Sequence, residues 1–195
     1  MIHVSFDLVD RFVPRVPVQR SPGEDAETPR ICVAPDLISA LQAIPQAGET
    51  LLNMQRCKLP LIIHAYYLES CNVLSSEEIK EKVGDAEATG EMWIMEEPKS
   101  VRRIDYEITD FFSAVKKDCF GTTGRFVVCI STKRVKYQSN WENLANSVSD
   151  NPANAKWFLT NRPKGITFRT FASNLDEEMI KRINELRGNS DEEKE

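Results

Sequence analysis

The amino-acid sequence predicts an α+β fold in a single domain, because strand-like and helix-like segments follow one another in mixed order. The segments do not alternate regularly, as they would in a fold built from βαβ units. With 195 residues, the chain can bury roughly 70% of the surface that it exposes when unfolded. We therefore predict one domain over residues 1–188 and a short, solvated acidic tail at 189–195.

The first half of the chain contains five strand-like segments. Each is rich in apolar, β-branched or aromatic residues and is bounded by turn-forming residues. The segment LPLIIHAYYLE is apolar over most of its length, which is typical of a central strand. In the first 104 residues these predicted strands lie at 1–5, 30–34, 59–69, 91–95 and 101–104.

Helix signals lie between these strands. Asp36 begins a helix with an apolar stripe, and Pro45 ends it. Ser75 and Glu78 have the spacing of a capping box and open a second short helix that stops at Gly84. Between these helices, the residues that follow Pro45 are expected to form a polar connection.

Two short segments complete the first half of the chain. DLVDRF, at 7–12, is expected to form a brief helical turn, and DAEATG, at 85–90, a turn without a helix.

The second half of the chain is also mixed. Residues 105–118 place Ile108, Phe111, Phe112 and Val115 at helical spacing, which predicts a helix. The remaining segments are predicted as strands at 125–131 and 165–172, helices that begin near Ser139 and Pro152, and an amphipathic helix at 174–187.

A long loop separates the first two predicted strands. Residues 11–30 contain four prolines and four arginines, and Gly23 with its acidic neighbours favours a turn. Irregular connections of this length are uncommon in compact domains and usually carry function. We therefore expect this Arg/Pro loop to contact a ligand or a partner.

Composition excludes several classes of function. The net charge of −5 argues against a protein that wraps duplex nucleic acid. The five cysteines form no CxxC pair and there are two histidines, so we expect no metal site and free thiols in a reducing compartment. No apolar run of about 18 residues occurs, and we expect a cytoplasmic protein without a membrane partner.

Three residues combine the chemistry needed to hold a dinucleotide. His3 stands in the first strand, Arg30 opens the second, and Glu91 opens a later one. A guanidinium binds phosphate oxygens in pairs, and a neutral imidazole can bond a ribose hydroxyl. A carboxylate can stabilise the positive charge that develops when a glycosidic bond breaks. This combination suits NAD. His64, within the apolar run LIIHAYY, is interpreted instead as a satisfied core histidine and not as a ligand.

The same segments resemble the small ADP-ribosyltransferase-like proteins of bacteria and phages over roughly residues 1–105. The likeness rests on HVS at 3–5, on RICVA with its following helix, and on GEMWIMEEPKSVRRI at 90–104. It implies a mixed or antiparallel central sheet split in two, with short flanking helices. It also implies that Glu91 is catalytic. It places His3 on a ribose of NAD, and the serine or tyrosine that the family has near the nicotinamide could be Ser39, Tyr66 or Tyr67. We also expect Ser5 and Arg30 to bind NAD.

The resemblance implies a mono-ADP-ribosyltransferase that modifies a macromolecule. Arginine-modifying members carry a second glutamate two residues before the catalytic one, where this chain has Thr89, so arginine is not the expected acceptor. One alternative is a non-catalytic phage or mobile-element accessory protein that binds a host protein through the Arg/Pro loop. A weaker alternative is an activity like that of RNA 2′-phosphotransferases.

Overall fold

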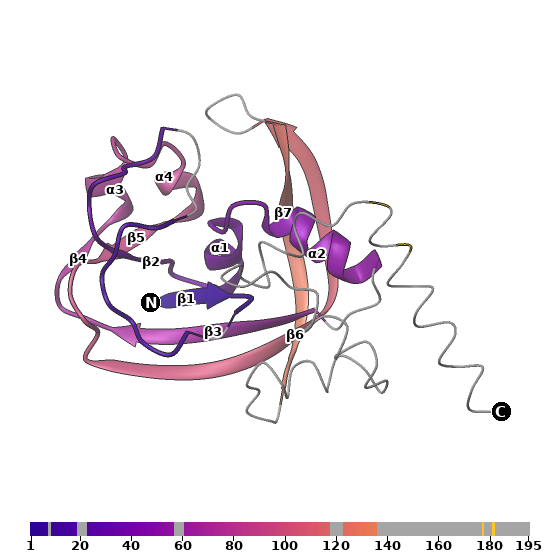
Figure 1. Cartoon of the computed structure of the whole chain (residues 1–195), viewed down its shortest axis with the longest axis horizontal. Helices are drawn as coiled ribbons and strands as arrows, with labels where there is room; N and C mark the ends of the chain where they lie inside the picture. The colour runs from indigo at the N-terminus through magenta and orange to yellow at the C-terminus, as the bar shows by residue number, and fades with distance from the viewer. Residues whose placement is uncertain are drawn as a thin grey trace.

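The computed structural model describes residues 1–7, 9–18, 23–56, 61–117 and 123–135, together with Glu177 and Lys181. These residues form two antiparallel sheets and a few short helices (Figure 1). The predicted α+β class is therefore confirmed, as are two separate sheets. The predicted segments from 139 onward and the acidic tail lie outside the described residues, except that Glu177 and Lys181 are helical.

The larger sheet has the strand order β1-β3-β6-β7. Two helices, α1 and α2, lie beside it near β7 (Figure 1). Apolar side chains of α1, α2 and one sheet face form the largest core cluster, with Phe6, Leu41, Leu51 and Ile63 fully buried. The bounds are β1 (Ile2–Ser5), β3 (Ile62–Glu69), β6 (Ser100–Lys117), β7 (Thr123–Arg134), α1 (Leu37–Gln42) and α2 (Ala47–Arg56).

The smaller sheet has the order β2-β5-β4 and carries two one-turn helices on one face. Trp93, the largest fully buried side chain among the described residues, packs there with Ile79 and Val83. Figure 1 shows α3 and α4 close to β5, at the end of the molecule away from α2. The bounds are β2 (Ile31–Val33), β4 (Val73–Leu74), β5 (Met92–Ile94), α3 (Ser76–Ile79) and α4 (Ala86–Thr89).

The two sheets meet where β1 passes β2. Ile2 and Ala34 exchange two backbone hydrogen bonds of 2.9 Å. A second apolar cluster fills the space between the sheets and joins residues of both. Its buried members are Phe12, Ile31, Val33, Tyr66, Leu68 and Ile94.

The predicted helix at 105–118 is wrong, because β6 continues as one strand to Lys117. Helical spacing would place Ile108, Phe112 and Val115 on one buried face. Ile108 is buried, but Phe112 is 61% exposed and Val115 is 60% exposed. The aromatic and β-branched residues of this segment also favour a strand, and pairing with β7 along most of its length provides the hydrogen bonds. Tertiary pairing therefore overrides the local helical pattern.

Two helices replace segments that the sequence predicts as connections. The polar connection after Pro45 contains α2, which buries Ala47, Leu51 and Met54 at helical spacing. The predicted turn at 85–90 contains α4, which ends at Gly90 in the left-handed conformation, with φ of 66°. Both helices are polar in composition, so their apolar positions are too few to be noticed without the core that they cover.

The brief helix predicted at 7–12 is absent from the described residues there, which exclude Leu8. Phe6 and Phe12 are buried instead. The described part of the Arg/Pro loop is irregular as predicted, apart from an antiparallel bridge between Arg15 and Arg30. In the described part of the chain, no helix is long and apolar enough to cross a membrane.

Candidate functional site

Glu91 lies in a polar cluster on the face of the smaller sheet that α3 and α4 cover. The left-handed turn at Gly90 ends α4, and the Glu91 N–H still bonds the Ala86 carbonyl before β5 begins. The Glu91 carboxylate accepts a 2.7 Å hydrogen bond from the Trp93 indole N–H. Glu91 is 7% exposed, so the carboxylate has left bulk water.

The burial has an electrostatic consequence. It raises the pKa of the Glu91 carboxyl above its usual value, against the opposing effect of hydrogen bonds from the Trp93 indole and the Cys32 thiol. Burial likewise raises the pKa of the Cys32 thiol, and the adjacent Glu91 charge raises it further. Cys32 is therefore an un-ionised thiol next to a carboxyl group that favours protonation.

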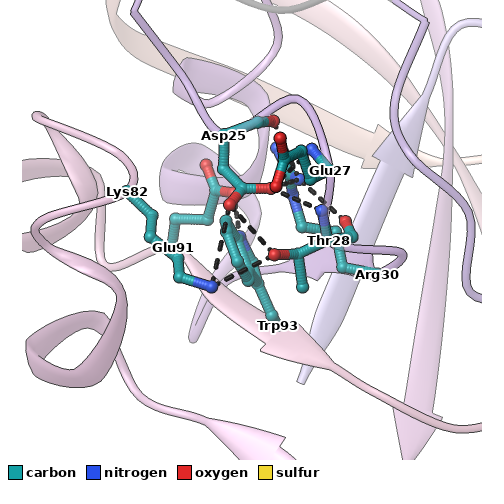
Figure 2. A network of polar contacts seen from close by, with 7 residues as sticks. All are labelled: Asp25, Glu27, Thr28, Arg30, Lys82, Glu91 and Trp93. Carbon is teal, nitrogen blue, oxygen red and sulfur yellow. Dashed lines mark hydrogen bonds and ion pairs between the residues drawn. The ribbon is translucent and has the colours of Figure 1, made fainter.

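Arg30 lies on the same cluster and is 2% exposed. Its guanidinium stacks 4.0 Å from the centre of the Trp93 ring. One terminal nitrogen donates to the carbonyls of Thr28, at 3.0 Å, and Asp25, at 3.1 Å. Arg30 thus holds the end of the Arg/Pro loop in a closed turn against Trp93 (Figure 2).

Asp25 anchors that turn to the segment after α3. Its carboxylate accepts bonds from the Thr28 N–H at 2.6 Å and the Thr28 hydroxyl at 2.9 Å, and Lys82 Nζ lies 3.7 Å away. Burial acts to raise the pKa of Asp25, but the bonds from Thr28 and the Glu27 N–H, with the Lys82 charge, lower it to about 2. Figure 2 shows this loop lying over Trp93 and Glu91.

His3, Ser5 and Tyr66 form a second group, on one face of the larger sheet. His3 pairs with Tyr66 across β1 and β3, and Ser5 lies two residues further along β1. The His3 ring lies edge-on to Phe12, with centroids 5.2 Å apart. Its Nδ1 is 2.9 Å from the Cys32 carbonyl oxygen.

The two groups lie on opposite faces of β2. Cys32 and Trp93 share one face, and Glu91 joins them there. The His3 ring packs with Phe12 and Tyr66, which belong to the cluster on the other face. His3 thus contacts the backbone of Cys32 while Glu91 contacts its side chain, and the two side chains do not converge in this structure.

Ser39 belongs to neither group. It lies in the first turn of α1, where its hydroxyl donates to the Asp36 carboxylate at 2.9 Å and its N–H bonds the same side chain. Asp36 therefore caps the helix, and Ser39 completes the cap.

The sequence interpretation missed a buried polar network beside the second group. His64 Nδ1 lies 2.7 Å from Asp105 Oδ1, and the Arg103 Nε is 3.3 Å from the same oxygen. His64 is fully buried, and its Nε2 has no hydrogen-bond partner among the described residues. His64 is therefore a core histidine, as interpreted, with one ring nitrogen bonded and the other without a partner in the described ranges. The available signal was His64 itself, a polar residue within the otherwise apolar run of β3, which needs a polar partner on a neighbouring strand.

No group of three or more histidine, cysteine, aspartate or glutamate residues in the described ranges could hold a metal ion. No protein-family model, curated protein or solved structure matches the chain.

Proposed function

We propose that this protein binds NAD and transfers ADP-ribose to a macromolecule. The observation that carries the proposal is the neighbourhood of three segments that lie far apart in the sequence. β1 with His3 bridges to the end of β2, and β2, which Arg30 precedes, pairs with β5, which Glu91 precedes. A shared NAD site requires the side chains of His3 and Glu91 to face a common cleft, and the neighbouring strands bring their segments together while the side chains lie on opposite faces of β2.

Each residue would have a separate task. His3 would bond a ribose hydroxyl of NAD, and Arg30 would contact the pyrophosphate. Glu91 would stabilise the positive sugar as the bond to nicotinamide breaks and its electron pair leaves with nicotinamide. An acceptor atom of the target then forms a bond to the same sugar carbon and releases its proton to water.

This chemistry demands a rearrangement of the Glu91 site. The carboxylate must ionise and leave the Trp93 indole to reach the side of β2 on which His3 lies. The Asp25–Arg30 turn that covers Trp93 would have to open when NAD enters. The Arg/Pro loop is then a lid on the site.

The test uses the full chain with NAD labelled in its adenylate half. We expect nicotinamide release and transfer of label to protein or nucleic acid in a cell extract. Glu91→Gln, which keeps the size of the side chain, should reduce the rate by at least about 100-fold. Glu97→Gln, at an exposed residue paired with Arg11, is the control and should keep the rate. The absence of both NAD binding and nicotinamide release contradicts the proposal.

The opposed faces of His3 and Glu91 favour a second candidate, a non-catalytic protein that binds a macromolecular partner through the Arg/Pro loop. Val18 is 90% exposed in this loop, and Val13 is 42% exposed. In that case NAD produces no thermal shift, and Val18→Asp removes binding of the partner without changing the melting temperature.

A further inference from the structure

We infer that Ser5, His64 and Asp105 form a nucleophile, a base and a positioning acid for acyl transfer from an activated carboxylic ester. The pairing registers carry this inference. Ser5 on β1 lies opposite His64 on β3, and His64 lies opposite Asp105 on β6. Opposed residues of antiparallel strands place their side chains on one face, with Cβ atoms about 4.5–5.5 Å apart. The three residues thus lie side by side on one face in the order Ser-His-Asp, with the His64–Asp105 bond formed and no bond from Ser5 to His64 Nε2 in the described part of the chain.

His64 makes one of the two contacts that a general base needs, the bond to Asp105, and its second ring nitrogen is left for a nucleophile. With Nδ1 donating to Asp105 at 2.7 Å, Nε2 is the ring's acceptor. Among the described residues Nε2 bonds nothing, although the side chain is fully buried. A histidine with a purely structural role would leave this buried acceptor unsatisfied at a cost in stability. A base must keep it free to take a proton.

Asp105 is the positioning residue. It is 5% exposed, and the Arg103 guanidinium beside it compensates its charge. A carboxylate in this place fixes the ring orientation and stabilises the positive ring after proton transfer.

Ser5 and Tyr66 are placed for the remaining tasks. Ser5 is half-buried at the end of β1, and its Oγ accepts a 3.0 Å bond from the Asp7 N–H, which leaves the hydroxyl proton available. The Tyr66 oxygen accepts a 2.8 Å bond from the Val9 N–H. Tyr66 pairs with His3, two residues from Ser5 on the same face, and would donate its hydroxyl proton to an oxyanion formed near Ser5.

The reaction balances with water as the only co-reactant. Ser5 Oγ attacks the carbonyl carbon while its proton moves to His64 Nε2, and the carbonyl electron pair moves to oxygen. When the tetrahedral adduct collapses, the alcohol leaves with the bonding electron pair and the proton from Nε2. Water then attacks acyl-Ser5 by the same route and releases the carboxylic acid.

The experiment treats the full chain, without nucleotide, with a fluorophosphonate probe and with p-nitrophenyl acetate. We expect one covalent adduct, mapped to Ser5 by peptide mass spectrometry, and a nitrophenolate burst of one equivalent. Mapping needs no variant, so it stays decisive even where a core substitution prevents folding. An adduct on another residue, or none, overturns the inference.

Variants separate the roles. Ser5→Ala should abolish the adduct, and His64→Gln should slow its formation by at least about 100-fold. Asp105→Asn should lower the acylation rate at saturating ester while the KM stays unchanged. Ser100→Ala, at an exposed serine of β6 that bonds Glu69, should match the unmodified chain. Equal rates in Ser5→Ala and Ser100→Ala would refute the role of Ser5. Because no NAD is present, these results are independent of those for ADP-ribosyl transfer.

Discussion

Two carboxyl groups around Trp93 respond to pH in opposite directions. Asp25 lies in a turn filled with hydrogen-bond donors, so its ionised form is favoured in the folded chain. Glu91 lies beneath that turn, where burial favours its protonated form. The closed turn is therefore most stable when Asp25 is ionised and Glu91 is not. The contribution of Asp25 to stability is lost as the pH falls from 3.8 to about 2, and that of Glu91 is lost as the pH rises above 4.5.

We predict that Asp25→Asn removes a stabilisation that acts above about pH 4. The folded pKa of about 2 lies below the usual 3.8, so the stabilisation is complete above 3.8 and is lost as pH falls toward 2. The shift corresponds to about 2 kcal/mol. Urea unfolding at pH 6 and pH 2.5 measures it: the free energy of unfolding should fall by less in Asp25→Asn. Asp110→Asn, at an exposed position of β6, is the control. An unchanged pH dependence in Asp25→Asn contradicts the prediction.

We predict that Glu91→Gln flattens the pH dependence of stability above about pH 4.5. The raised pKa means that the folded chain holds a proton that the unfolded chain has released, so stability falls as pH rises from 4.5 through the folded pKa. Glutamine keeps the acceptor for the Trp93 indole and does not titrate. Thermal unfolding between pH 5 and 8 should show a melting temperature that falls with rising pH in the unmodified chain and in Glu97→Gln. The same slope in Glu91→Gln would show that burial of this carboxyl does not control it.

At the scale of elements, close backbone contact holds α2 against β7. A Cβ atom at Gly48 would lie 2.4 Å from the carbonyl oxygen of Arg125, so only glycine allows this approach. The next residue, Glu49, pairs with the Arg125 side chain at 3.4 Å. Arg56, in the last turn of α2, pairs with Glu177. The helix is thus attached to the hairpin at one end and to a distant part of the chain at the other.

We predict that Gly48→Ala destabilises the chain by about 1–3 kcal/mol, because the helix must move away from a backbone atom that cannot yield. Gly124→Ala is a matched control on the hairpin, since its Cβ would lie 3.5 Å from the Phe126 ring, an ordinary contact. Urea denaturation of both variants gives the difference. Equal stability of the two variants would contradict the close contact.

The strength of sequence prediction differed among these elements. β3 and β5 were predictable because their apolar runs are dense and bounded by turn residues, and the Asp36 and Ser75 caps located α1 and α3. The second part of β6 was not, because its apolar residues follow helical spacing, and the pairing with β7, with its two register shifts, makes the segment a strand. The α2 helix was missed because a polar segment with Gly48 does not indicate a helix without its packing partner.

At the scale of the whole molecule, register decides what the candidate sites contain. Resemblance brought His3, Arg30 and Glu91 into one hypothesis, and the strands that carry them are neighbours. Which face each side chain occupies depends on single-residue register, because successive residues of a strand point to opposite sides. The His64–Asp105 pair has the same origin: the residues are 41 positions apart and meet only because β3 and β6 pair in this register.

Phe12 links the two sheets, and we predict that Phe12→Ala destabilises both together. Its ring contacts His3 and Tyr66 of the larger sheet and belongs to the cluster that includes Ile31 of the smaller one. Removing a buried phenylalanine side chain costs about 3–5 kcal/mol, a large share of the 5–15 kcal/mol typical of a domain.

Hydrogen exchange measured by mass spectrometry tests this link between the sheets. Amides of β2 and β5 should lose protection in parallel with those of β1 and β3, because opening the shared cluster exposes both. Val13→Ala, at the adjacent and 42% exposed residue, should change stability by no more than about 0.5 kcal/mol. If Phe12→Ala increases exchange in one sheet alone, the sheets are separate cooperative units. In that case Phe12 does not couple the stability of β1 to that of β2 and β5.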